Sequence, residues 1–106
     1  MEEINEMSNN SDMIAFLKEY ITDTIKKLVD DKNSIEVLIS PTTKSVIIQL
    51  RVNKADIGKI IGKQGRIIES LKILVSAIRN ANYPNDPRKI IVEILEDESS
   101  SFNYNK

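Results

Sequence analysis

The sequence predicts an α+β fold in which three helices cover one face of a three-stranded mixed sheet, in the order α-β-β-α-α-β. Apolar residues recur at intervals of three and four in two long stretches, which is typical of amphipathic helices. They alternate along three shorter stretches rich in Val and Ile, which is typical of strands buried on one face. A short third helix, separated from the last helix by glycines, completes the order.

The chain has 106 residues, of which 41% are apolar and 29% are charged, as in a single globular domain. Segments 1–12 and 96–106 are acidic and polar, so we expect flexible acidic tails around a folded domain at 13–95. The net charge of the chain is −1, but the domain itself holds 14 basic and 9 acidic residues, a net charge of +5. This basic body favours an anionic partner such as a nucleic acid.

Two missing residue types narrow the chemistry. The chain has no Cys, which excludes disulfides and thiol catalysis, and no His, which excludes a histidine base or metal ligand. Carboxylates and lysines remain, so an enzyme would have to be an unusual one, and we expect a protein that is not an enzyme and takes no cofactor, metal or small-molecule substrate. No stretch approaches the ~18 apolar residues that span a bilayer. The N-terminus is acidic, unlike a secretory signal, so we expect a cytoplasmic protein without a membrane partner.

The first helix is expected to begin at Asp12, a residue type that caps helix N-termini. The apolar residues on one face of this helix recur at spacings of three and four, and the polar residues 30–33 end the helix. Strands at 35–39 and 46–52 follow, and the turn at 41–44 makes them a hairpin. The apolar face of the helix consists of Ile14, Leu17, Ile21, Ile25 and Leu28.

The second half of the domain begins with a short helix capped by Asn53. A longer helix is predicted from Arg66 to Asn80, and a last strand from Lys89 to Leu95. The core stripe of the long helix is expected to consist of Ile67, Leu71, Leu74 and Ile78, flanked by Ile68 and Val75.

The segment between the two helices, Gly58–Ile68, holds all three glycines of the protein. Its spacing is Gly-x-x-x-Gly-x-x-Gly and a helix precedes it, so it is neither a dinucleotide-binding fingerprint nor a Walker A loop. It matches Ile-Ile-Gly-x-x-Gly-x-x-Ile, the signature of the KH domain. The rival interpretations are a tight structural turn and a DNA-binding helix-turn-helix, but the strands before and after this segment favour the KH loop.

Such a loop can hold a phosphate, because glycines allow a sharp turn and the next helix presents free amides at its start. Five bases and two acids lie between 54 and 72. We expect single-stranded RNA to lie on this loop and on an apolar groove near Ile57, Ile60 and Ile61. The predicted RNA-binding residues are Gly58, Lys59, Ile61, Gly62, Lys63, Gln64, Gly65 and Arg66.

The element order resembles a type II, or prokaryotic, KH domain, and the run Val52–Arg66 resembles small bacterial single-KH proteins of the KhpA (YlqC) type. The likeness covers residues 13–95. It implies binding of about four nucleotides of single-stranded RNA and post-transcriptional control linked to cell growth and shape. It also implies a homodimer or a heterodimer with a larger Jag-type KH protein (KhpB). The sequence departs from the family at Ile67-Ile68-Glu69, where an acid one turn past the loop would weaken phosphate contact.

An alternative function is a protein-interaction module in which RNA affinity is secondary. On the last helix, Ile73 and Ala77 lie off the core stripe, near Ser70 and Arg66, and we expect this face to take part in dimerisation. Other features have plainer interpretations. Phe16 and Tyr20 are expected in the core and Tyr83 against its own domain, and Asp30-Asp31 and Glu96-Asp97-Glu98 are expected to be solvated rather than to bind Mg²⁺.

Overall fold

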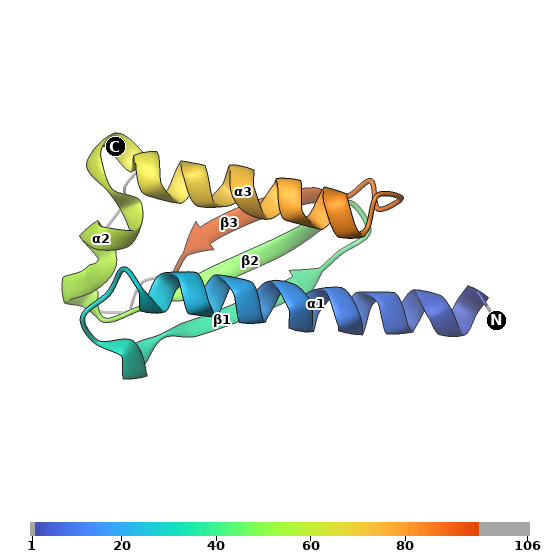
Figure 1. The fold of residues 1–106 in the computed structure, drawn as a ribbon, viewed down its shortest axis with the longest axis horizontal. Helices are drawn as coiled ribbons and strands as arrows, with labels where there is room; N and C mark the ends of the chain where they lie inside the picture. The colour runs from blue at the N-terminus through green and yellow to red at the C-terminus, as the bar shows by residue number, and fades with distance from the viewer. Residues whose placement is uncertain (1, 96–106) are drawn as a thin grey trace.

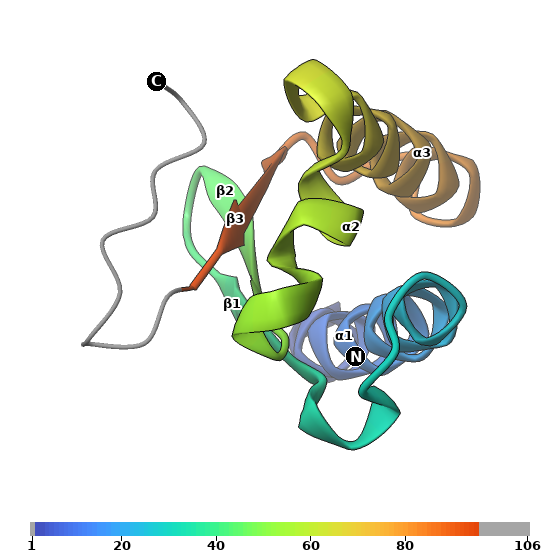
Figure 2. The same cartoon turned by 90° about the vertical axis from the view of Figure 1, so that its left-hand side faces the viewer.

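The computed structural model describes residues 2–95, with side chains from residue 10 onward. Three helices cover one face of a three-stranded sheet, which confirms the predicted α+β fold (Figures 1 and 2). The order also matches the prediction, with short 3₁₀ helices added at the junctions. The elements are α1 (Glu2–Lys26), η1 (Lys32–Ser34), β1 (Glu36–Pro41), β2 (Ser45–Arg51), η2 (Lys54–Asp56), α2 (Ile57–Ile61), η3 (Lys63–Gly65), α3 (Arg66–Asn82) and β3 (Lys89–Ile94).

The sheet is mixed, as predicted. β2 is the central strand, and it pairs antiparallel with β1 and parallel with β3. A parallel pair needs a long crossover, and α2 and α3 supply it between β2 and β3. Every second residue of β2 is buried under the helices, which confirms the predicted alternation. Pro41, predicted in the turn, instead ends β1 opposite Val46; β1 is an edge strand, where Pro is tolerated.

Helix α1 begins at Glu2, ten residues before the predicted start, so Asp12 lies inside the helix and does not cap it. No Gly or Pro interrupts residues 2–26, and acidic residues near the start match the positive end of the helix dipole. Residues 2–12, predicted as part of a tail, therefore continue the first helix. Residues 96–106 lie outside the described residues, and the flexibility of both acidic segments stays a prediction.

The faces that α1 and α3 bury are turned slightly from the predicted ones. On α3, Ile67 and Leu74 are 37% and 48% exposed, so their predicted place at the centre of the core stripe is wrong. Apolar residues cover more of this helix than one contact face needs, and packing against β3 and α2 selects one flank of that band. The buried apolar residues are Met13, Leu17, Ile21, Ile25 and Val29 from α1 and its C-terminal turn, and Ile68, Leu71 and Val75 from α3.

Two of the described aromatic residues, Phe16 and Tyr83, meet where α3 leads into β3. The rings of Phe16 and Tyr83 lie edge to face, with centroids 6.3 Å apart. Tyr83 also packs against the core, which confirms that it contacts its own domain. Tyr20 is half-buried on the core, whereas Phe16 is 38% exposed, so its prediction as a core residue is wrong. Among the described helices, none is long and apolar enough to cross a membrane.

Candidate nucleic-acid interface

The loop between α2 and α3 has a backbone that requires its glycines. Gly62 and Gly65 have φ of +74° and +73°, and Gln64 between them has φ of +57°. A Cβ on Gly62 would lie 2.5 Å from Cγ1 of Ile67, well inside van der Waals contact. No Cβ contact restricts Gly65, so its positive φ is the reason for glycine there. A left-handed Gln is uncommon and such residues gather at functional sites, which singles out this loop.

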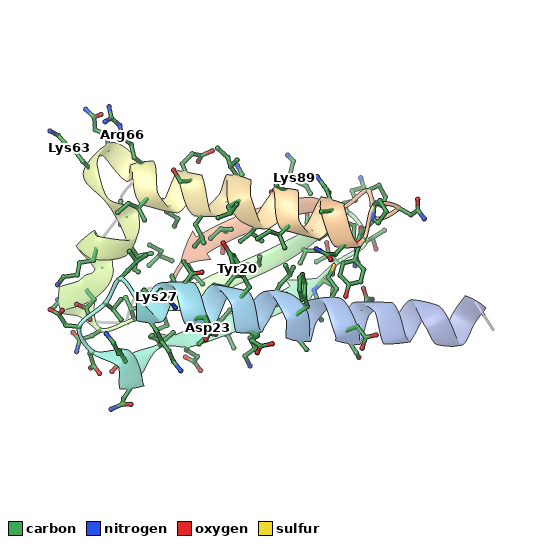
Figure 3. All side chains as sticks on the ribbon, in the orientation of Figure 1. Tyr20, Asp23, Lys27, Lys63, Arg66 and Lys89 are labelled. Atoms are coloured by element: carbon green, nitrogen blue, oxygen red, sulfur yellow. The ribbon has the colours of Figure 1, made fainter. Side chains whose placement is uncertain are left out.

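The side chains of this loop point into solvent at one corner of the molecule. Lys63, Gln64 and Arg66 are exposed, and Figure 3 shows Lys63 and Arg66 projecting together from the start of α3. Neither cation has an ion-pair partner among residues 10–95. No side chain caps the start of α3, which adds the positive end of a 17-residue helix, although the N–H groups of Gly65 and Arg66 already bond the carbonyls of Gly62 and Lys63. This corner therefore presents uncompensated positive charge to an anion.

A groove runs from this loop along α3 and is closed on its other side by β3. Its apolar lining comes from Ile61, Ile68, Ile90, Ile91 and Val92, and its polar lining from Gln64, Glu69, Lys72, Ser76, Arg79, Arg88 and Lys89. An apolar floor with polar edges suits planar bases with hydrogen-bonding rims. Figure 3 shows Lys89 toward the other end of α3 from Lys63 and Arg66. Lys89 therefore supplies a basic group at one end of the groove, and Lys63 and Arg66 lie by the loop at the other end.

Much of this groove is missing from the sequence prediction. Lys72, Ser76 and Arg79 are spaced by four and three residues, a polar stripe on one face of α3 that the spacing alone reveals. Lys89 joins them only because β3 packs beside α3, which no local pattern shows. Of the three isoleucines predicted to form the groove, Ile57 and Ile60 are buried in the core and only Ile61 lines it.

Lys59, predicted to bind RNA, is held by carboxylates away from the loop. Its ammonium lies 3.1 Å from Asp30 Oδ2 and 3.2 Å from Asp56 Oδ1, and these bonds raise the pKa of Lys59. Asp56 is 2% exposed, and its Oδ2 accepts a 3.0 Å hydrogen bond from the backbone N–H of Asp31. That bond lowers the pKa of the Asp56 carboxyl and outweighs the effect of burial. Lys59 thus joins α2 to the turn that follows α1.

The neighbouring Asp31 caps η1, and its carboxylate accepts bonds from Ser34 and from the Asn53 side chain. Asn53 caps η2, as predicted for the start of this region, although the cap is on a 3₁₀ turn rather than on α2. Asp30 is largely exposed, as expected of solvated charge. No three metal-ligating side chains gather within residues 10–95.

Gly58 and Ile61, the two remaining predicted residues, lie on α2. Gly58 is exposed with open space around it, and its carbonyl accepts the N–H of Gly62 at 2.9 Å, which ends α2 at the loop. Ile61 is 6% exposed, so it contributes to the wall of the groove from within the core. The structure therefore gathers Lys63, Gln64 and Arg66 at one corner and sets Lys59 apart from them.

The comparisons with known proteins show the family of the chain. Residues 18–94 match a family model described as KhpA/KhpB, KH domain. An RNA-binding protein KhpA from Aquifex aeolicus is 40% identical over 83 residues, which are 78% of this chain and 100% of the relative. The proteins of that name from Chlamydia caviae and Listeria monocytogenes are 35% and 36% identical, over 77% and 76% of this chain and all of theirs. No solved structure matches.

Proposed function

Because the chain belongs to the KhpA/KhpB family of KH domains, we propose that it binds single-stranded RNA at the loop Gly62–Gly65 without catalysing a reaction. The observation that carries this proposal is the loop itself. It combines a left-handed backbone, a helix start that no side chain caps, and two exposed cations, Lys63 and Arg66, that no carboxylate among residues 10–95 neutralises. A phosphate at this corner gains hydrogen bonds and charge together.

In this proposal the loop positions the strand and the groove receives the bases. The backbone of Gly62–Gly65 approaches one phosphate closely, and Lys63, Gln64 and Arg66 surround it. The following bases lie over Ile61 and Ile68, with their edges toward Glu69 and Lys72. Contacts to phosphate carry no sequence information, so sequence preference is weak at the loop and comes from the groove. The protein acts in the cytoplasm, in post-transcriptional control linked to growth and shape.

A gel-shift titration with single-stranded RNA tests the loop. The double change Lys63→Asp and Gln64→Asp replaces attraction with repulsion at the phosphate, and we expect affinity to fall by at least about thirtyfold. Both side chains are exposed, so the midpoint temperature of thermal unfolding should stay the same as in the wild type. The matched control carries Lys18→Asp and Ser11→Asp, which make the same change of net charge at exposed positions of α1. Equal affinity of the loop variant and the wild type would contradict the proposal.

Salt dependence gives a second readout of the same site. Two or three phosphate contacts on a single strand predict a slope of log K against log salt of about −1.4 to −2.1. The loop variant should lose most of that slope and the α1 control little of it. A slope near zero for the wild type would mean that the loop cations do not contact phosphate.

We also propose that the chain forms dimers through the outer face of α3. Ile73 is 61% exposed and Leu74 48%, and Ala77 and Ser70 beside them are exposed as well. A second copy, or the larger Jag-type KH protein (KhpB) in a heterodimer, would cover these side chains. Two-fold symmetry sets the same helix against itself, so one substitution acts twice.

Light scattering tests the dimer. Ile73→Glu should give a folded monomer, because it would bury two carboxylates without partners. Lys72→Glu on the same helix is the control for added negative charge outside the apolar face. A wild type that stays monomeric at high concentration would contradict a homodimer, and its mixture with the larger KH protein then tests the heterodimer.

A further inference from the structure

The end of the groove remote from the loop holds a compact cluster of two arginines and one aspartate. Arg88 binds Asp86 through Nη2 at 2.7 Å and Nε at 2.9 Å, so this pair is closely joined. Arg79 lies behind it, with Nη2 donating a 2.6 Å hydrogen bond to the carbonyl of Arg88. Arg79 and Arg88 both line the groove. The cluster therefore places a second guanidinium where α3 passes the start of β3.

Arg79 is left with unused hydrogen-bond donors. Its side chain is 5% exposed, and Nε donates to Asn80 Oδ1 at 3.0 Å. Nη1 is buried with no hydrogen-bond partner, and its nearest carboxylate oxygen, Oδ2 of Asp86, is 3.8 Å away. That separation gives an ion pair but no hydrogen bond. A buried donor without an acceptor is costly, so such a group calls for an explanation.

The charges of the cluster point to an anionic or acceptor-rich ligand. Two guanidiniums share one carboxylate, Asp86, whose pKa is lowered first of all by its bond to Arg88. Arg79 shares this carboxylate with Arg88 in a place where water reaches Arg79 poorly, so its unused donors favour an acceptor that carries negative charge. The free edge of Arg79, formed by Nη1 and the second N–H of Nη2, is a fork suited to two acceptor atoms.

The position of Arg79 matches a strand that already contacts the loop. Arg66 and Arg79 are 13 residues apart on α3, which is about 20 Å along the helix axis. Arg79 lines the groove, and Arg66 lies at the loop beside its other end. A single strand that leaves the loop along this groove would therefore pass Arg79 several nucleotides on.

We propose that Arg79 is a second RNA contact, at the far end of the groove, that takes a bidentate acceptor. This acceptor is either the oxygen pair of a phosphate or the O6/N7 edge of a guanine, the two RNA groups that match the arginine fork. The inference rests on the proposed RNA binding at the loop and extends it. Asp86 competes with RNA for Arg79, so it limits affinity at this end.

The first test is a length series of single-stranded RNA, from 4 to 10 nucleotides, measured by fluorescence polarisation on the full chain. Arg79→Gln removes the fork, and Lys27→Gln, at an exposed position just past the end of α1, removes one charge elsewhere. We expect Arg79→Gln to bind the longest RNA about tenfold more weakly than the control does. The length at which the two curves part measures the distance from the loop. Equal affinities of Arg79→Gln and the control at every RNA length would overturn the proposal. That result is the one expected if a buried water, and not RNA, satisfies Nη1.

The second test does not depend on a variant that loses function. Asp86→Asn leaves Arg79 in place and weakens its competitor, so we expect RNA to bind about threefold or more tightly. Asp23→Asn, an exposed carboxylate on α1, controls for the change of net charge. A gain cannot come from misfolding, and adding Arg79→Gln should abolish it. Equal gains for Asp86→Asn and Asp23→Asn would overturn the proposal.

Two further comparisons separate the sources of the acceptor. A phosphate contact predicts that Arg79→Gln lowers the salt slope by about 0.7 for every RNA sequence. A guanine contact predicts that the variant loses a preference of about fivefold or more for guanine over adenine at one position, and that Arg79→Lys loses it too. Failure of the loop proposal would appear instead as an unchanged affinity of the Lys63→Asp, Gln64→Asp variant, while Arg79→Gln still weakens binding.

Discussion

Lys59 and Lys63 lie four residues apart in the sequence, and the structure uses them in opposite ways. Lys59 is bound by Asp30 and Asp56, so its charge is compensated and it joins α2 to the turn that follows α1. Lys63 is exposed beside Arg66, and no described side chain neutralises either. Counting basic residues therefore overstates the charge available to RNA. What matters is which cations lack a carboxylate partner, and Lys63 and Arg66 are two such cations that lie together beside the glycine loop.

The strongest way to break this contrast is to change the glycine that shapes the exposed corner. Gly62→Ala places a Cβ against Ile67 at a positive φ, and we expect a loss of about 2 kcal/mol in the free energy of unfolding. Gly58→Ala, in open space within α2, should gain about 0.5 kcal/mol, since alanine favours a helix more than glycine does. Urea unfolding of both variants compares them. Equal effects would show that the loop backbone is not constrained as described.

A smaller effect is expected at the compensated corner. Asp56→Asn removes a buried charge that three donors contact or approach, and the thermal midpoint should fall by about 5 °C or more. RNA affinity, measured well below that midpoint, should stay unchanged because the loop is untouched. Asp23→Asn, an exposed carboxylate on α1, is the control and should shift neither value. A large loss of RNA affinity in Asp56→Asn would show that the Asp56–Lys59 cluster and the loop act as one RNA-binding site.

The dependence of stability on pH gives a further test of the role of Asp56. The folded protein lowers the pKa of Asp31, Asp56 and Asp86 below the ordinary value of 3.8, so it binds fewer protons than the unfolded chain. Their stabilising effect is therefore complete above the ordinary pKa and is lost as the pH falls through the lowered values. We expect stability to be level from pH 7 to about 5 and to decline below about 4. Asp56→Asn should decline less steeply; an identical acid profile would contradict this role for Asp56.

The smallest effect concerns Glu69, which lines the groove one turn past the loop. Its carboxylate repels the strand, so Glu69→Gln should tighten RNA binding by about two- to threefold, most clearly at low salt. Glu19→Gln on the exposed side of α1 makes the same change of charge at a distance. If both variants bind RNA alike, the acid at 69 plays no part in the groove.

The sequence predicted the parts of this protein that depend on local patterns. The alternation in Val46, Ile48 and Leu50 fixed a buried strand face, and the glycine spacing located the loop. It could not decide between adjacent apolar flanks of a helix, which is why Ile67 and Leu74 were misplaced.

The sequence did not predict the contacts between segments that are far apart along the chain. Asp31 and Asp56 are 25 residues apart, and nothing local shows that one backbone N–H meets the other's carboxylate. The bond between Arg79 and the carbonyl of Arg88 likewise forms only once α3 has turned back into β3. The charge of a lysine can be read from the sequence, but whether a carboxylate already holds it depends on these tertiary contacts.

The most direct measurement compares Lys63→Gln with Lys59→Gln in a fluorescence-polarisation titration with one single-stranded RNA, alongside thermal unfolding. The two variants lose the same charge four residues apart. The account predicts that Lys63→Gln weakens RNA binding by about fivefold with an unchanged midpoint. Lys59→Gln should lower the midpoint and leave RNA affinity within about twofold of wild type. The reverse pattern, or equal losses of affinity, would contradict the claim that the uncompensated Lys63, and not the compensated Lys59, contacts RNA.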